Sequence, residues 1–279
     1  MPFPKAIDYH KPNKPEIPNG LGIIYVLTST IYLFFLHFLD FKGALPLASC
    51  VLFGGFMGLV DDWLNLRWRY KAFLPIFASI PLIALREGET VMSTYIFGKI
   101  DFGIYYYLVI APLIVTVITN SVNMLGGLNG LETICPLIII IGFILISQER
   151  ILLLVPALVL LLLAFYNYRG KIFVGNVGSF SFGTTLAAYA IIANIEQTLL
   201  ISTVPYVFNS TIILLNHFLY RRRAQILSDG GKLFSKHRRS LITIITYKRK
   251  MTERQVVNIV ATLFIISTSL AILAYVILP

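Results

Sequence analysis

The chain has 279 residues, of which 57% are hydrophobic and 13% are charged, with 23 Lys and Arg against 13 Asp and Glu. Soluble domains carry roughly 25% charged residues, so this composition excludes a water-soluble globular protein. The two cysteines, Cys50 and Cys135, lie inside apolar runs, and two are too few for a disulfide framework. We expect a single membrane-embedded domain over residues 1–279.

Apolar runs separated by polar loops predict an all-α polytopic membrane protein, because a helix needs about 20 apolar residues to cross the hydrocarbon. The chain opens with a polar, proline-rich segment, residues 1–19, which we expect to be extended. β-branched and aromatic residues predict a short hairpin within residues 90–100, and residues 240–247 also have a strand-like composition. About nine spans are expected near residues 20–39, 43–60, 72–85, 103–122, 131–147, 151–166, 177–195, 198–219 and 256–278.

Basic residues are biased to one side of the predicted membrane. Of the 23 Lys and Arg residues, all but Lys42, Arg86, Lys99 and Arg150 lie in the N-terminal segment or in the loops after the second, fourth, sixth and eighth spans. The positive-inside rule therefore predicts that these loops are cytoplasmic. We interpret the excess charge, including Arg221–Arg223, as a signal for topology and for contact with membrane lipid, and we expect no nucleic-acid partner.

Two adjacent carboxylates, Asp61 and Asp62, close the second predicted span, and Lys71 follows them. The carboxyl end of a helix is the negative end of its dipole, and the membrane boundary adds a desolvation cost. Such a pair indicates a carboxylate site that meets a cation, or a base beside a phosphate, with Lys71 facing an anion. The alternative is a solvated loop in which the aspartates pair with nearby arginines.

Asparagines and glycines are concentrated in and around the loop after the fourth predicted span. This stretch has the sequence Asn120-Ser121-Val122-Asn123-Met124-Leu125-Gly126-Gly127-Leu128-Asn129-Gly130-Leu131-Glu132. Glycines allow tight turns and the close approach of a ligand. Side-chain amides at the membrane boundary must form hydrogen bonds, since an unpaired polar group in lipid is costly. The spacing favours a flat, hydrogen-bonding ligand such as a nucleobase, and the alternative is a polar hinge between two helices.

Two further polar segments fall on the same face. Residues 173–180 open a predicted span, where backbone N–H groups favour an anion or a metal–phosphate, with a simple helix cap as the alternative. The cluster Lys236-His237-Arg238-Arg239 suits either a pyrophosphate or anionic lipid. Carboxylates, amides and basic groups together suit a divalent metal with a phosphorylated ligand, and Mg²⁺ prefers oxygen ligands and substrate phosphates.

Two long motifs carry a resemblance to a known family. Residues 61–71 and 123–132 resemble the aspartate-pair motif and the nucleotide loop of the polyprenyl-phosphate N-acetylhexosamine-1-phosphate transferases. The chain is most similar to their eukaryotic and archaeal UDP-GlcNAc–dolichyl-phosphate branch, whereas the bacterial muramyl-pentapeptide relatives have aspartates at Gly126 and Asn129. The resemblance covers nearly the whole chain. It implies a ten-helix fold with cytoplasmic active-site loops, a Mg²⁺ cofactor with Mn²⁺ as an alternative, and a homodimer.

The resemblance also implies roles for individual residues. Asn123 and Asn176 stand at positions of Mg²⁺ ligands, and Phe173 stands beside the uracil. The expected catalytic residues are Asp61, Asp62, Lys71, His237 and Arg238. The expected substrate-binding residues are Gly127, Asn129, Glu132, Phe173, Lys236 and Arg238.

Two departures from the family pattern bear on activity. Asn176 replaces the aspartate of the family's Phe-Val-Gly-Asp motif. Because an amide oxygen can bind Mg²⁺ but carries no charge, we expect a lower metal affinity, which Asp61 and Asp62 compensate unless the enzyme is weak or inactive. In the family the segment resembling residues 8–20 follows a first helix, so we expect that helix to be absent here.

The reaction implied by the resemblance transfers GlcNAc-1-phosphate from UDP-GlcNAc to a dolichyl or other polyprenyl phosphate. Its products are GlcNAc-diphospho-lipid and UMP, in the first step of lipid-linked glycan assembly for N-glycosylation. The alternatives are the same reaction with another UDP-N-acetylhexosamine, an inactive homologue, and a non-enzymatic transporter. We expect a multi-pass protein of an archaeal plasma membrane or of the endoplasmic reticulum, with its active site on the cytoplasmic face.

Overall fold

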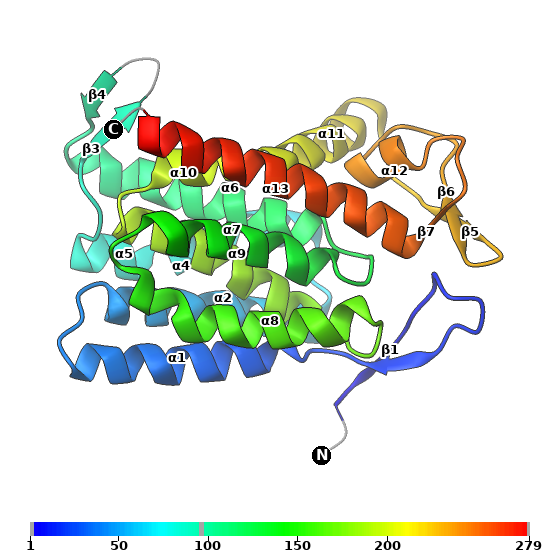
Figure 1. Ribbon diagram of the computed structural model, residues 1–279, viewed down its shortest axis with the longest axis horizontal. Helices are drawn as coiled ribbons and strands as arrows, with labels where there is room; N and C mark the ends of the chain where they lie inside the picture. Colours follow the sequence, from blue (N-terminus) through cyan, green and yellow to red (C-terminus); the bar gives the residue numbers. More distant parts are fainter. Residues whose placement is uncertain (1–2, 95–97, 278–279) are drawn as a thin grey trace.

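The computed structural model describes residues 3–94 and 98–277, which form a bundle of helices with small antiparallel sheets at its two ends (Figure 1). The helices are α1 (Gly22–Phe38), α2 (Ala44–Leu64), α3 (Trp68–Phe73), α4 (Pro75–Ala78), α5 (Ile80–Leu85), the π-helical turn η1 (Tyr106–Ile110), α6 (Ala111–Met124), α7 (Leu131–Ile146), the 3-10 turn η2 (Arg150–Leu153), α8 (Leu154–Tyr168), α9 (Gly175–Ile192), α10 (Glu196–Ser202), α11 (Val204–Tyr220), α12 (Leu241–Ile245) and α13 (Glu253–Ile277). The strands are β1 (Lys5–Ile7), β2 (Glu16–Pro18), β3 (Val91–Thr94), β4 (Gly98–Asp101), β5 (Leu227–Asp229), β6 (Lys232–Phe234) and β7 (Met251–Thr252).

Several helices have the dimensions of membrane spans. Within the described residues, four helical stretches are long and apolar enough to cross a membrane, and α10 with α11 forms a fifth candidate that is bent by 61°. Helices α1 and α7 are apolar but shorter. The mostly helical, multi-pass architecture agrees with the sequence analysis, whereas the number of nine spans stays a prediction. The four stretches are Ala44–Leu64, Tyr106–Met124, Arg150–Tyr168 and Glu253–Ile277.

The segment expected as a single span over residues 72–85 is not one continuous helix. Three short helices, α3, α4 and α5, replace it. Pro75 and Pro81 each stand in the first turn of a new helix. Proline has no N–H to give to the preceding turn and its ring clashes there, so the two prolines divide the segment.

The β-structure confirms one expectation and corrects another. Strands β3 and β4 pair from Val91↔Asp101 to Thr94↔Gly98, as the hairpin prediction requires, and the expected tip, residues 95–97, lies outside the described residues. Residues 240–247 are not a strand, because they contain α12. A reciprocal capping box begins this helix: the Ser240 hydroxyl accepts from the Thr243 N–H at 3.2 Å, and the Thr243 hydroxyl accepts from the Ser240 N–H at 2.8 Å.

Helix α9 is the centre of the bundle. All of its residues from Val177 to Ile191 are buried, and it packs against α1, α2, α6, α7 and α10. Two glycines of α2 lie where a side chain would collide with it: a Cβ at Gly54 would overlap the Thr184 side chain, and one at Gly58 would overlap the backbone of Asn176 and Val177. Small residues at such spacing let helix backbones approach closely in a membrane.

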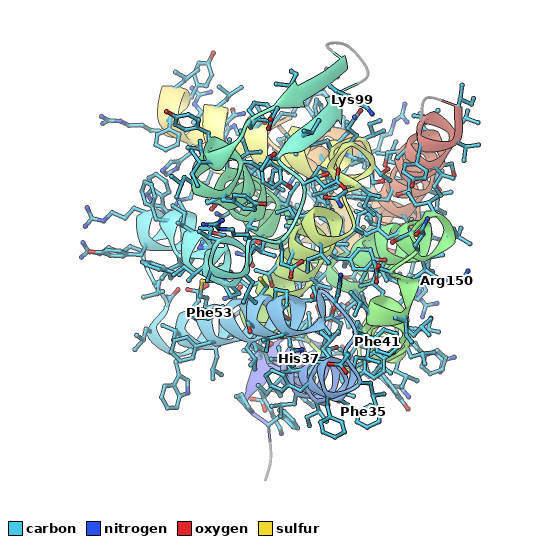
Figure 2. All side chains as sticks on the ribbon, turned by 90° about the vertical axis from the view of Figure 1, so that its left-hand side faces the viewer. Phe35, His37, Phe41, Phe53, Lys99 and Arg150 are labelled. Carbon is cyan, nitrogen blue, oxygen red and sulfur yellow. The ribbon has the colours of Figure 1, made fainter. Side chains whose placement is uncertain are left out.

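The two ends of the bundle differ in character. The hairpin of β1 and β2, the three-stranded sheet of β5 to β7, and α12 lie at one end, on the right of Figure 1. We call this end the loop face. The opposite end, viewed directly in Figure 2, carries Lys99 and Arg150, two of the four basic residues predicted to lie away from the basic loops. The surface between the ends is apolar, as Phe35 of α1 illustrates with 58% exposure.

Substitution of Gly58 by alanine should destabilise the protein, because the new methyl group meets rigid backbone of α9. Overpacking of this kind costs about 1–3 kcal/mol. Thermal unfolding in detergent should therefore show a lower midpoint for Gly58→Ala than for the wild type. The adjacent Leu59→Ala, at an exposed position of the same helix, is the matched control. Equal midpoints for the two variants would contradict the close packing of α2 on α9.

Candidate active site

The carboxylate of Asp62 caps a helix other than its own. Its Oδ1 accepts a hydrogen bond from the Asn176 N–H at 3.0 Å, and its Oδ2 accepts one from the Val177 N–H at 3.1 Å. Both donors belong to the first turn of α9, whose N–H groups lack partners within the helix and carry the positive end of its dipole. The unfavourable position of Asp62 at the end of α2 is therefore offset by the beginning of α9.

Asp61 is buried and forms an ion pair with Lys71. The Lys71 ammonium of α3 lies 2.7 Å from the Asp61 Oδ2. The Asp61 Oδ1 accepts a hydrogen bond from the Leu66 N–H at 3.1 Å. With 2% of its surface exposed, Asp61 is not part of a solvated loop, and its partner is a lysine and not an arginine.

The Ser179 hydroxyl links the two predicted metal ligands, Asn123 and Asn176. The Ser179 hydroxyl donates to the Asn123 Oδ1 at 2.7 Å and lies 3.4 Å from the Asn176 carbonyl oxygen. The Asn176 side chain is also hydrogen-bonded to Asp62. Helices α2, α6 and α9 thus bring Asp62, Asn123 and Asn176 into one cluster on the loop face.

The cluster suits a cation that takes part of its ligands from a substrate. It offers one carboxylate and two amide side chains. Over residues 3–94 and 98–277, no group of three or more His, Cys, Asp or Glu side chains converges on a common point. Mg²⁺ is usually held by one or two carboxylates together with substrate phosphates and water. Asp62, Asn123 and Asn176 therefore fit a Mg²⁺ ion that arrives with a diphosphate, and they do not fit an all-protein metal cage.

An apolar groove borders this cluster at Asn123. Its volume is about 660 Å³, and it lies between α3, α6 and α11. Lys71 and Asn123 belong to its lining, so the ion pair and the amide cluster both border it. Most of the remaining wall is apolar. Its lining includes Trp68, Val117, Ile213, Leu214, Arg222 and Arg223.

A second cavity, the polar pocket, lies between the N-terminal segment and the glycine-rich loop. Its volume is about 300 Å³. It brings together four residues that the sequence analysis assigned to substrate binding, namely Gly127, Asn129, Glu132 and Phe173. Glu132 lies in the first turn of α7, and its carboxylate accepts a hydrogen bond from the Gly127 N–H at 3.3 Å.

A third cavity, of about 280 Å³, adjoins both of the others. It shares Met124, Ile213 and Ala224 with the apolar groove. It shares His10 and Gly127 with the polar pocket. The third cavity therefore lies between the groove and the pocket on the loop face, and its lining includes Ser240 at the start of α12.

The basic cluster of residues 236–239 lies outside these three cavities. Lys236, His237 and Arg238 line none of the three cavities formed by the described residues. The Arg238 guanidinium stacks 4.3 Å from the centre of the Tyr247 ring. Burial and the nearby charge of Arg239 lower the pKa of His237, whose Nε2 accepts a hydrogen bond from the Gln225 N–H at 3.1 Å. The substrate roles of these three residues stay predictions.

Several residues at the site were missed by the sequence analysis. Asp8, which was assigned only to a stiff leader, is buried and lines the polar pocket. Glu253, at the start of α13, binds Asn129. Arg222 and Arg223, interpreted as a topology signal, border the apolar groove. Their positions depend on contacts between distant segments, and no local pattern identifies them.

Comparisons with known proteins place these features in a family. Residues 44–194 match the glycosyl transferase family 4. A protein of Saccharolobus solfataricus, named as a UDP-N-acetylglucosamine–dolichyl-phosphate N-acetylglucosaminephosphotransferase, is 34% identical over 266 residues, which cover 90% of this chain and 82% of the relative. A protein of Sulfolobus acidocaldarius with the same name is 30% identical over an alignment of 283 positions, which covers 95% of this chain and 86% of the relative.

A more distant relative comes from a bacterium. A phospho-N-acetylmuramoyl-pentapeptide-transferase of Streptococcus pyogenes is 26% identical over 244 residues, which cover 79% of this chain and 72% of the relative. The family match spans more than half of the chain, and the two archaeal relatives match it over nearly its whole length. The chain therefore belongs to glycosyl transferase family 4.

Proposed function

We propose that this protein transfers GlcNAc-1-phosphate from UDP-GlcNAc to a dolichyl or other polyprenyl phosphate. A phosphate oxygen of the lipid forms a bond to the β-phosphorus of the nucleotide sugar, the bond between that phosphorus and UMP breaks, and GlcNAc-diphospho-lipid is produced. The names of the archaeal relatives support this reaction. The observation that carries the proposal is the position of the Asp62–Asn123–Asn176 cluster at the apolar groove, with the third cavity lying between this groove and the polar pocket.

The dimensions of the two outer cavities suit the two substrates. The polar pocket has room for a nucleoside and carries amide and aromatic side chains that suit a flat base. The apolar groove suits an isoprenoid chain whose phosphate lies next to Lys71. A diphosphate would then extend through the third cavity toward Asn123, so that both reacting phosphates meet at the cluster.

The hydrogen bonds of the aspartates favour positioning over proton transfer. Each Asp62 oxygen accepts a backbone N–H, and Asp61 is held in an ion pair with Lys71. A phosphate monoester has a second pKa of about 6, so the lipid phosphate is largely ionised at neutral pH and needs no base. Phosphoryl transfer depends mainly on positioning and charge neutralisation. In our proposal, Asp61 holds Lys71 beside the nucleophile, and Asp62 fixes α9 and its amide ligand.

Bound Mg²⁺, or Mn²⁺ in its place, would neutralise charge on the diphosphate. Asp62, Asn123 and Asn176 are the residues that would hold it. Asn176 supplies no negative charge, so more of the binding energy must come from the substrate phosphates. The active site would lie on the cytoplasmic face of an archaeal plasma membrane, which the basic residues of the loop face and the archaeal relatives support.

Membranes containing this protein should release UMP from UDP-GlcNAc only when both a polyprenyl phosphate and Mg²⁺ are present. Radiolabelled UDP-GlcNAc allows the lipid product and the remaining substrate to be measured in the same sample. UMP release without the lipid would contradict the transfer reaction. If another UDP-N-acetylhexosamine is turned over faster than UDP-GlcNAc, that sugar nucleotide is the donor.

The same assay separates the site from the rest of the loop face. Asp62→Ala should reduce turnover by about 100-fold or more, the upper range for the loss of a group that orients a metal site. Asp229→Ala removes an exposed carboxylate that is paired with Lys250 outside the three cavities, and it is the matched control. Equal turnover of the two variants would show that Asp62 does not belong to the active site.

Filling the groove should affect the lipid and not the nucleotide. Leu214 lines the groove, whereas Leu215, its neighbour on α11, does not. We expect Leu214→Trp to raise the KM for a long polyprenyl phosphate by about 10-fold, since the bulky ring removes space that one or two isoprene units would bury. The KM for UDP-GlcNAc should not change. If Leu215→Trp has the same effect, the groove is not the lipid site.

Restoring aspartate at position 176 should strengthen the dependence on metal. Asn176→Asp places a second carboxylate against Asp62, and two adjacent carboxylates repel each other unless a cation or a proton lies between them. The variant should be less thermally stable than the wild type without Mg²⁺, and it should gain more stability when Mg²⁺ and UDP are added. The Mg²⁺ concentration for half-maximal activity should also fall. An unchanged metal response would show that residue 176 is not a ligand.

A further inference from the structure

The side-chain amide of Asn129 is held from one end by two carboxylates. Its Nδ2 donates to the Asp8 Oδ2 at 2.9 Å and to the Glu253 Oε1 at 3.0 Å. The same Glu253 oxygen accepts from the Asn129 backbone N–H at 2.7 Å. An amide nitrogen carries two hydrogens, so both are used. Asn129 is 3% exposed, and solvent does not compete for these bonds.

The two carboxylates determine which way the amide points. An ionised carboxylate only accepts hydrogen bonds, so the end of Asn129 that faces Asp8 and Glu253 must be the nitrogen. Turning the amide over would place its oxygen against two anions. Burial alone would raise the pKa of Asp8, but hydrogen bonds from Lys11 and Asn129 outweigh this effect and lower it, so Asp8 is ionised at neutral pH.

The other end of the amide is unpaired. The Asn129 Oδ1 is buried and has no hydrogen-bond partner in the described part of the chain. Asn129 lines the polar pocket together with Phe173 and Gly127. Leaving a buried acceptor unpaired costs about 1–3 kcal/mol. Because Asn129 lines a ligand-sized pocket, a ligand that brings an N–H donor would satisfy this oxygen.

We propose that Asp8 and Glu253 are positioning residues that fix the Asn129 amide, so that its Oδ1 selects nucleobases with a ring N–H and rejects bases with a bare ring nitrogen. The proposal rests on the proposed function, which places the base in the polar pocket. Uracil has a hydrogen on its N3, whereas N3 of cytosine is an acceptor. Cytosine would leave two acceptors facing each other, which a site built around a buried polar group rejects strongly.

The selection depends on three segments that are far apart in the chain. Asp8 precedes the turn of the N-terminal hairpin, and Lys11 of this turn binds both the Asp8 carboxylate at 2.9 Å and the Gly170 carbonyl oxygen at 3.2 Å. Glu253 is the first residue of α13. The docking of the hairpin on the loop face and the start of the last helix thus set the orientation of a single amide in the loop between α6 and α7.

The test compares the binding of UDP and CDP, in the presence of Mg²⁺, to purified protein in detergent. The wild type should prefer UDP by about 10- to 100-fold, the effect of one buried acceptor left unpaired. In the double variant Asp8→Asn, Glu253→Gln, both partners can donate as well as accept, so the amide can turn over. The preference should fall to within about 3-fold, with tighter CDP binding than in the wild type.

A matched control separates positioning from general loosening. Glu16→Gln breaks the exposed ion pair with Lys5 on the same hairpin but leaves Asp8, Lys11 and Glu253 unchanged, so it should keep the ratio of UDP binding to CDP binding. If the double variant does not fold, as judged by thermal unfolding, Glu253→Gln alone should show a smaller shift of the ratio. A wild-type ratio kept by the folded variants would overturn the positioning role alone. A wild type that fails to bind UDP would overturn the proposed function with it.

Discussion

The carboxylate of Asp62 joins the end of α2 to the beginning of α9, and the arrangement of the loop face depends on this interaction. Helix α9 is buried from Val177 to Ile191, and its first N–H groups have no partners within the helix. Asp62 satisfies two of them. Gly58, one turn earlier in α2, allows the two backbones to approach closely enough for the carboxylate to reach. The same contact holds the start of α9, where Ser179 links Asn176 to Asn123. The Asp62 carboxylate therefore caps α9 and also brings together the residues that we propose as metal ligands.

Other polar side chains bind the remaining segments of this face in a similar way. The Asn209 Nδ2 donates to the Met124 carbonyl oxygen at 3.1 Å, and its Oδ1 accepts from the Leu241 N–H at 2.9 Å. Asn209 therefore connects α6, α11 and α12. Asn167 accepts from the Gly130 N–H at 2.8 Å and so holds the glycine-rich loop. Apolar packing between helices gains little in lipid, because the lipid tails are equally apolar, so buried hydrogen bonds of this kind specify how the segments fit together.

The sequence was sufficient to predict on which face of the membrane a residue at the end of a span lies. Asp61, Asp62 and Asn123 could be expected on one face, because each lies at a boundary and the direction of each span follows from the basic loops. Sequence reasoning failed at residues 240–247, where the capping box of Ser240 begins a helix in a segment of strand-like composition. It also missed the breaks that Pro75 and Pro81 introduce into the helical segment 72–85. The importance of Asp8 could not be predicted, since its partner Asn129 lies 121 positions further along the chain.

The apolar groove has a consequence for how its ligand would be measured and supplied. A long isoprenoid bound between α3, α6 and α11 remains dissolved in the bilayer both before and after it binds, because these helices lie within the apolar belt of the bundle. Its occupancy then depends on the mole fraction of acceptor among the surrounding lipids and not on the volume of buffer. Diluting vesicles would empty the polar pocket of nucleotide while leaving the groove filled. Binding of the lipid would therefore depend on its concentration within the membrane, whereas binding of the nucleotide would depend on its concentration in solution.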